Sequence, residues 1–369
     1  MNYARNIASW VVVLALAILD SYNSMYSCLT SVDTNTVGIL YEGSRSRICF
    51  QKLDLLEILN ASRVSSDDVN DLVSKLENIK SAQLYKFQLK DDKGGRMDCL
   101  KVFQPTAKGD VYGVYHAMTG GVLSICLGIS EKELTQWRQL CVLDEHGSQA
   151  TVHVCEDGGF LIAYEKDAPN AVHIRLRYYP DLAALTGGKF SHEYDIARTL
   201  APTAEGTPSF ESVKIENSDP AKSEIRMRFH YFENANVDQL AEGRLSNFKS
   251  WTSSPLEQLN KTIAQQGGLG NIGDRDRFTW RGRSYYLQEV QLKRLDWGSW
   301  RTFLCDAQGS PIKQLAFKTP GGSVAFSNST VTRIEDAKGR ERLVVTQFIH
   351  RAGSRLKEHG ELIYVIDSE

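Results

Sequence analysis

The sequence predicts an all-β protein folded as a five-bladed β-propeller, with a small helical segment near its N-terminus. After residue 98 the chain alternates short apolar segments with turns that contain Gly or Asp, such as Thr119-Gly120-Gly121 and Asp157-Gly158-Gly159. Such turns between two strands are typical of β-hairpins. The format recurs at irregular spacing, with repeats that begin near residues 112, 149, 207, 273 and 323. This recurrence favours propeller blades with loop insertions, and one or two β-sandwiches are the alternative.

The beginning of the chain is apolar. Residues 7–19 form a predominantly apolar run between Arg5 and Asp20. A membrane-spanning helix needs about 20 apolar residues, so this run is short for a span and is typical of the core of a secretory signal peptide. We therefore expect residues 1–24 to be a signal peptide, with an uncleaved anchor as the alternative. The mature protein is expected to be secreted, without stable insertion in a membrane.

Residues 25–110 are expected to form an N-terminal segment that carries a surface helix and a strand that closes the ring. The helix is predicted by apolar residues at helical spacing behind the polar residues 65–68, namely Val69, Leu72, Val73, Leu76 and Ile79. Residues 37–50 are the candidate for the closing strand. Residues 111–369 then make up the propeller body.

Composition excludes one class of partner. The chain has 43 Lys and Arg against 45 Asp and Glu, a formal net charge of −2. Nucleic-acid binding usually needs a basic surplus, so no nucleic-acid partner is expected. Small molecules are the expected partners, and the oligomeric state stays open.

The cysteines and the glycosylation triplets agree with a secreted protein. Seven cysteines are present, and in an oxidising compartment most are expected to pair, which leaves one over. They show no Cys-x-x-Cys spacing, and no nucleotide-binding fingerprint occurs, so neither a metal nor a cofactor is expected. The acceptor triplets for N-glycosylation begin at Asn60, Asn260 and Asn328.

Polar side chains recur near the start of each predicted repeat. In a propeller the innermost strand of each blade faces a central channel, so residues from distant repeats would meet at the mouth of that channel. His116 and His153 are candidates for acid–base chemistry there, although buried histidines are as often packing residues. The carboxylates available near the channel are Glu165, Glu205, Glu211, Asp274, Asp276 and Glu289.

The repeat pattern after residue 98 resembles the five-bladed propellers of the arabinanase, invertase and levansucrase superfamily. Those enzymes hydrolyse glycosides with carboxylates on inner strands near the channel. The resemblance implies a general acid and a second carboxylate that acts as base or nucleophile. A third class with this fold is a carbohydrate-binding lectin, which would show several equivalent sites.

The whole profile also resembles the secreted, glycosylated hetero-Diels–Alderases of fungal tropolone–sesquiterpenoid biosynthesis. The segments that carry this likeness are SQATVHVCEDGGFLIAYEK, AEGTPSFESV, NIGDRDRF, GSWRTFLCD and GGSVAFSN. It implies a cofactor-free reaction in which a tropolone quinone methide adds to a humulene-type alkene.

Such a reaction needs two partners held in register, a hydrogen-bond donor on the tropolone oxygen, and an acid–base pair to expel water. We assign these catalytic tasks to His153, His116, Glu205 and Arg275. The residues expected to line the substrate pocket are Tyr115, Thr151, Phe210, Asp274 and Phe278. We expect this cycloaddition as the function, with glycoside hydrolysis as the alternative and lectin binding as the third possibility.

Overall fold

The computed structural model describes residues 27–31, 36–43, 47–54, 66–167, 169, 171–234 and 236–367. The chain divides into two units, residues 1–71 and 72–369. The first unit contains an antiparallel sheet of three strands in chain order, β1 (Ser27–Ser31), β2 (Thr36–Gly43) and β3 (Arg47–Asp54). The expected signal peptide over residues 1–24 and the glycosylation site at Asn60 lie outside the described residues.

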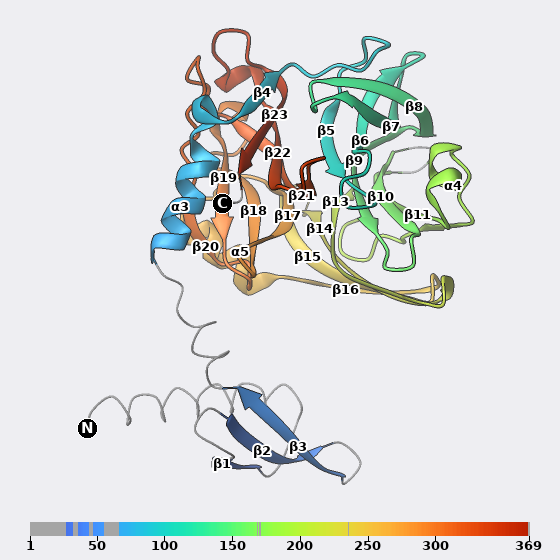
Figure 1. The fold of residues 1–369 in the computed structure, drawn as a ribbon, viewed down its shortest axis with the longest axis vertical. Helices are drawn as coiled ribbons and strands as arrows, with labels where there is room; N and C mark the ends of the chain where they lie inside the picture. Colours follow the sequence, from blue (N-terminus) through green and yellow to red (C-terminus); the bar gives the residue numbers. More distant parts are fainter. Residues whose placement is uncertain are drawn as a thin grey trace. The chain divides into compact units, whose positions relative to one another are not determined.

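The described residues of the second unit confirm the predicted architecture: five antiparallel four-stranded sheets are arranged as blades around one axis (Figure 1). Blade I contains β5 (Asp98–Phe103), β6 (Tyr112–Thr119), β7 (Val122–Lys132) and β8 (Gln136–Glu145). Blade II contains β9 (Gly147–Val154), β10 (Phe160–Lys166), β11 (His173–Tyr179) and β12 (His192–Asp195). Blade III contains β13 (Glu205–Glu216), β14 (Asp219–Glu233), β15 (Val237–Ser246) and β16 (Ser250–Pro255).

Blade IV contains β17 (Ile272–Trp280), β18 (Arg283–Gln291), β19 (Trp300–Cys305) and β20 (Pro311–Gln314). Blade V contains β21 (Phe326–Glu335), β22 (Glu341–Ile349), β23 (Gly360–Asp367) and, from the other end of the chain, β4 (Leu84–Phe87). The first strand of each blade is innermost. These inner strands contact one another in the closed order β5, β9, β13, β17, β21 and back to β5.

Ring closure differs from the expectation. The strand that completes blade V is β4, which pairs antiparallel with β23, whereas the candidate residues 37–50 lie in β2 and β3 of the three-stranded sheet. Blade I also starts earlier than residue 112, because its inner strand β5 precedes β6 across a loop of residues 104–111 instead of a tight turn. The predicted boundary at residue 111 therefore falls inside blade I.

The predicted helix is present as α3 (Ser66–Glu77), followed by a 3₁₀ turn over Ile79–Ser81. Its apolar face is buried, with Leu72 and Leu76 fully inaccessible. The Tyr364 hydroxyl of β23 donates a hydrogen bond of 2.9 Å to the Leu76 carbonyl, so the helix is attached to blade V. Figure 1 shows α3 at the rim of the propeller and away from its axis.

The hydrophobic core lies between neighbouring blades. Blades II and III share one cluster that includes Leu161, Ile174, Met227 and Phe229, and all four side chains are at most 1% exposed. Similar clusters join blade I to blade II and blade V to blade I. Burial of both faces of each sheet explains the long apolar segments that predicted strands in the sequence.

No described helix is both long and apolar enough to cross a membrane. Most of the seven cysteines were expected to pair, but Cys126, Cys141 and Cys155 are free thiols in the described part of the fold. Burial raises the pKa of Cys126 and Cys141 to about 11 and of Cys155 to about 12. These thiols are therefore protonated at neutral pH and act as small apolar side chains.

Candidate functional site

The central channel has two separate mouths. Since the inner strands run in the same direction along the axis, their first residues surround one end, here called the strand-start mouth, and their last residues surround the strand-end mouth. Between them the free space is only about 10 Å³, enough for about one water molecule. An ion pair of 2.7 Å joins Lys101 to Asp276, and the Asn328 side-chain amide donates to Gln149 Oε1 at 2.6 Å. These contacts block the channel.

Each inner strand carries an irregularity close to the strand-start mouth. The pairing register of the inner strand with the second strand shifts in every blade, as it does at a β-bulge. In four blades the bulge holds a non-glycine residue in the left-handed region, with φ of 55° at Cys99, 55° at Gln149, 48° at Thr207 and 49° at Asn328. Backbone strain of this kind persists only where the surroundings enforce it, and it is common beside functional sites.

The surroundings that enforce it are side chains from the preceding blade. The Gln149 amide donates to His116 Nδ1 at 3.3 Å, and the Thr207 amide donates to Glu165 Oε1 at 2.8 Å. The Asn328 amide likewise donates to Glu289. His116 and Glu165 lie on the second strand of their blades, where each pairs with the residue just before the bulge of its own blade. We call this set of acceptors the bulge clamp.

In blade V a residue of the third strand accepts the hydrogen bonds from the bulge of blade I. The second strand of blade V has Phe348 at the equivalent position, opposite Ser327, and a phenyl ring cannot accept the hydrogen bond. Instead, the Glu361 carboxylate of the adjacent strand β23 accepts hydrogen bonds from the Cys99 amide at 3.0 Å and the Leu100 amide at 3.3 Å. Glu361 is 1% exposed, and burial, reinforced by the charge of Asp98, raises its pKa well above its usual value.

Carboxyl and imidazole groups gather at the strand-start mouth on the side of blades II and III. His230 Nε2 lies 3.8 Å from Glu165 Oε1 and 3.8 Å from Asp238 Oδ1. Glu165 also accepts hydrogen bonds from the Thr207 hydroxyl at 2.8 Å and the Ser148 hydroxyl at 3.1 Å. Burial raises the pKa of Asp238, His230 lowers it in part, and the charge of Glu165 raises it further. Asp238 is therefore the group of this cluster that is suited to carry a proton.

A second carboxyl group stands at the same mouth on blade I. Asp98 is the first residue of β5, pairs with His116, and forms an ion pair of 3.0 Å with the exposed Arg96. Burial raises the pKa of Asp98, while the charge and hydrogen bond of Arg96 act against that rise. The side chains of Asp98 and Asp238 are each 19% exposed, so both remain accessible to a ligand.

The structure does not bring His153, Glu205 and His116, the three described side chains among the four assigned to catalysis, into one cavity. His153 lines a cavity at the strand-end mouth, together with Phe278, and its ring lies 5.9 Å from that of Phe210. Glu205 is 1% exposed and accepts hydrogen bonds from the backbone amides of residues 199–201. His116 belongs to the bulge clamp at the strand-start mouth.

The remaining assigned residues are also spread out. Tyr115 is fully buried and donates to Asp91 at 2.8 Å, because it lies on the second strand of blade I and not the first. Thr151 borders the narrow part of the channel. Asp274 and Arg275 lie on β17, and their side chains are outside the described residues.

Sequence reasoning missed Asp98 and Asp238. Asp98 was overlooked because β5 was not recognised as the inner strand of blade I. Asp238 is the second residue of β15, five residues beyond the end of β14 at Glu233, and no spacing connects it to Glu165 in blade II. The signal that could have found Asp98 is its place before an apolar segment that ends at Phe103, ahead of the first recognised hairpin.

Two expected glycosylation sites are occupied by structural contacts. Asn260 is 7% exposed, and its amide nitrogen donates to the Leu240 carbonyl at 3.0 Å while its oxygen accepts from the Leu240 amide at 2.9 Å. Asn328 is 6% exposed and faces the channel. A glycan is attached through this same nitrogen, so the fold has no room for one at either residue.

Comparison with known proteins gives likenesses of fold. No family model and no curated protein matches the chain. Among solved structures, a thermostable family-43 glycoside hydrolase aligns with a TM-score of 0.48 and 10% identity, covering 76% of this chain and 92% of that one. The α-L-arabinanase of Penicillium chrysogenum aligns with a TM-score of 0.44 and 11% identity, over 94% and 93%. A family 117 glycoside hydrolase of Zobellia galactanivorans aligns with a TM-score of 0.47 and 12% identity, over 77% and 90%.

All three likenesses fall below a TM-score of 0.5 and below 25% identity, so function has to be argued from the side chains of this chain. Among the described residues, no group of three or more His, Cys, Asp or Glu side chains is arranged to hold a metal ion.

Proposed function

We propose that the protein hydrolyses glycosides at the strand-start mouth, with Asp238 as the proton donor and Asp98 as the second carboxylate. The observation that carries this proposal is the presence of two accessible carboxyl groups with raised pKa values at one mouth, in surroundings of opposite charge. Asp238 faces the carboxylate of Glu165, whereas Asp98 faces the guanidinium of Arg96. Such a difference separates an acid from a base in many hydrolases.

The roles follow from these surroundings. A proton on Asp238 is retained because ionisation would place a second negative charge beside Glu165, so Asp238 can protonate the departing oxygen of the sugar. Asp98 is held closer to its ionised form by Arg96, and it would activate water or attack the anomeric carbon. The Ser148 hydroxyl donates its proton to Glu165, so its oxygen can still accept a hydrogen bond from a hydroxyl group of a sugar.

The test compares Asp238→Asn and Asp98→Asn with the wild type on a panel of aryl glycosides. Loss of a general acid costs roughly 10²–10⁴-fold, and the loss should shrink when the leaving group is a dinitrophenol that needs no protonation. We expect this leaving-group dependence for Asp238→Asn, and a uniform loss for Asp98→Asn. Asp110→Asn, at an exposed loop residue, is the matched control. Absence of hydrolysis across pyranosides and furanosides of both anomers would refute the proposal.

A second candidate is the hetero-Diels–Alder addition, and one observation favours it. The strand-end cavity combines apolar walls with His153 and Phe278, two of the residues assigned to that reaction, and Phe210 lies against His153. The test supplies a hydroxymethyl tropolone and a humulene-type alkene and measures the dihydropyran product. Product that forms with wild type and falls at least tenfold with His153→Ala would support it. Equal product with and without protein would eliminate it.

A further inference from the structure

The strand-end mouth holds a cavity of about 400 Å³ that the proposed hydrolysis does not use. It is formed by the last residues of four inner strands, β5, β9, β17 and β21. The Lys101–Asp276 ion pair closes its inner end, because Asp276 Oδ2 also accepts a hydrogen bond of 2.8 Å from the Val331 amide and is thereby fixed across the channel. The cavity is therefore blind, and it opens on the side of the ring opposite to Asp98 and Asp238.

The lining of this cavity is cationic. It includes Lys101, Arg277 and Arg333, and none of the lining residues whose side chains the structure describes is Asp or Glu. The Lys101 charge is compensated by Asp276, and Arg333 forms an ion pair with Glu341 in which both side chains are more than a third exposed, so that pair is weak. The described hydrogen bonds of Arg277 go to neutral acceptors, the Glu211 carbonyl at 3.1 Å and the Ser284 hydroxyl at 3.2 Å. Both guanidinium groups therefore remain able to attract an anion.

Part of the cavity wall is apolar. Phe278 is 6% exposed, and its ring packs against Tyr285 at 5.9 Å between centroids, which holds it in place. Val152 and Val331 add aliphatic surface. Burial lowers the pKa of His153, with a smaller opposing effect from Glu156, so its imidazole is neutral at pH 7 and offers a further aromatic face.

We propose that this cavity binds a flat organic anion, an aromatic or comparable ring that carries a single acidic group. The ring would lie among Phe278, His153 and the valines, and the acidic group would contact the guanidinium groups of Arg277 and Arg333. Arginine binds carboxylates and sulfonates through two parallel hydrogen bonds, and a partly enclosed apolar wall strengthens that attraction. The inference is independent of hydrolysis at the other mouth.

The experiment measures binding of 2-naphthoate and of its neutral isostere 2-naphthamide to the full-length protein by calorimetry at pH 7. We expect 2-naphthoate to bind with a submillimolar Kd and 2-naphthamide to bind at least tenfold more weakly. Arg277→Gln and Arg333→Gln should each weaken the binding of 2-naphthoate at least fivefold and leave the binding of 2-naphthamide unchanged. The control is Arg294→Gln, an exposed arginine in the β18–β19 loop on the other side of the ring.

Equal binding of acid and amide, or 2-naphthoate affinity that survives both substitutions, would overturn the proposal. Both arginines are at the surface, so their variants are expected to fold, and circular dichroism checks this directly. Hydrolysis of aryl glycosides by Arg333→Gln should match the wild type. A failure of hydrolysis in all variants alike would count against the proposed function and leave this binding site standing.

Discussion

At the residue scale, the bulge clamp explains why unlike residues occupy equivalent places around the axis. In three of the blades the strained amide at the bulge donates to a side chain of the preceding blade, and the acceptor is an imidazole nitrogen of His116 or a carboxylate oxygen of Glu165 or Glu289. The requirement is for a lone pair at a given point and not for a particular residue type. A polar residue near the channel is therefore often committed to the backbone before any ligand arrives, as His116 is.

The first prediction concerns His116 and pH. Burial, together with the charge of Arg96, lowers the pKa of His116 to about 4. As the pH falls, His116 therefore binds a proton in the unfolded chain at a higher pH than in the folded protein. The stability that neutral His116 contributes is present in full above about pH 6.5 and is lost towards pH 4. His116→Asn keeps an acceptor for the Gln149 amide without a titratable group. It should reduce the loss of unfolding free energy between pH 7 and pH 4 by roughly 1–3 kcal/mol.

Urea unfolding at several pH values measures this loss. Asp98 and Glu361 have raised pKa values and change stability in the opposite direction over part of the same range, so the comparison is between variant and wild type at each pH. Identical pH profiles for the two proteins would show that His116 does not titrate as inferred.

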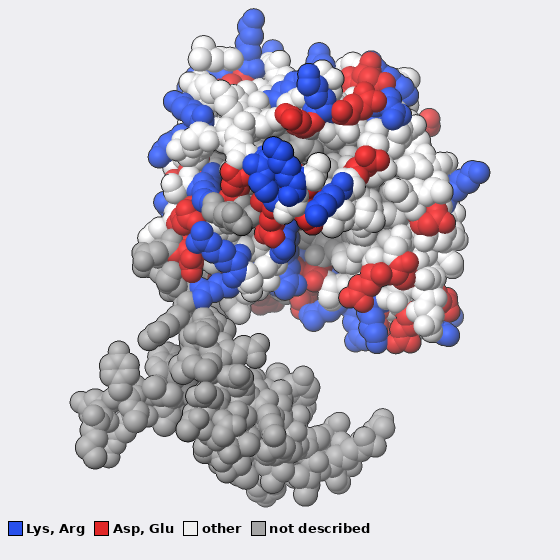
Figure 2. Space-filling model, in the orientation of Figure 1, with Lys and Arg blue, Asp and Glu red and all other residues white. Residues whose placement is uncertain are grey.

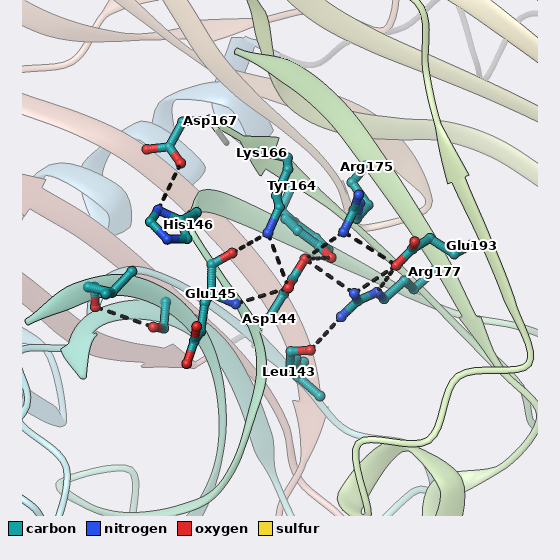
Figure 3. A network of polar contacts seen from close by, with 12 residues as sticks. Leu143, Asp144, Glu145, His146, Tyr164, Lys166, Asp167, Arg175, Arg177 and Glu193 are labelled. Carbon is teal, nitrogen blue, oxygen red and sulfur yellow. Dashed lines mark hydrogen bonds and ion pairs between the residues drawn. The ribbon is translucent and has the colours of Figure 1, made fainter. Parts of the chain in front are cut away.

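At the scale of elements, blades I and II are joined by a polar network as well as by apolar packing. Figure 3 shows Asp144 of β8 surrounded by cations from β10 and β11. Its carboxylate accepts from the Tyr164 hydroxyl at 2.7 Å and lies 3.2 Å from each of Lys166, Arg175 and Arg177. Burial alone would raise the pKa of Asp144, but Tyr164, Arg177 and Lys166 outweigh it and hold the pKa below its usual value.

The second prediction is that Asp144→Asn destabilises the protein by about 3–5 kcal/mol at pH 7, because it leaves the buried Lys166 without its counter-charge and leaves Arg177 with Glu193 alone. Since the pKa is lowered, this contribution is present above the usual carboxyl pKa and disappears as the pH falls through the folded value. Asp167→Asn is the control in the same region, since its pair with His146 spans 3.8 Å between half-exposed side chains and should contribute less than about 1 kcal/mol. Equal effects of the two substitutions in urea unfolding would contradict the assignment.

The third prediction concerns the loops of blades IV and V beside the strand-start mouth. Trp297 is 58% exposed, and its ring centroid lies 5.4 Å from that of His350. The His350 Nε2 atom in turn lies 2.7 Å from the hydroxyl of Ser327, the residue before the bulge at Asn328. In the hydrolysis proposed above, an exposed indole at this place would stack on a sugar ring bound beyond the cleavage point. Trp297→Ala should raise KM for oligosaccharides about tenfold, or about 1.4 kcal/mol.

The kcat for a simple aryl glycoside should stay unchanged in Trp297→Ala, because that substrate does not reach the loop. Phe190→Ala, which removes another exposed aromatic ring on blade II, serves as the control. An equal rise in KM for the short and the long substrate would assign Trp297 to folding and not to binding.

At the scale of the whole molecule, the number of blades and four of the five inner strands could be predicted from the sequence, because buried antiparallel strands and Gly turns leave a local pattern. Pairing between segments that are far apart in the chain leaves no such local pattern in the sequence. β4 and β23 are neighbours although more than 270 residues separate them, and Asp98 and Asp238 share a mouth only because the ring closes. The distribution of surface charge does not mark out one part of the face drawn in Figure 2, since basic and acidic side chains are intermingled over it.

The last prediction tests how strongly closure by β4 stabilises the ring. β4 is the edge strand of blade V, where alternate backbone N–H groups point towards β23 and towards solvent. Proline removes an N–H group, which costs about 3 kcal/mol or more where that group is hydrogen-bonded and little where it faces solvent. Of Tyr85→Pro and Lys86→Pro, one should therefore lower the unfolding free energy strongly and the other weakly.

Tyr85→Ala and Lys86→Ala isolate the side-chain contributions, which include a hydrogen bond of 2.7 Å from Lys86 to the Thr135 carbonyl in blade I. If closure by β4 holds the ring together, the disruptive proline should lower a single cooperative transition for all blades, because every inner strand depends on its two neighbours. Separate unfolding of blade V, seen as a second transition in calorimetry, would show that the ring is stable without this strand.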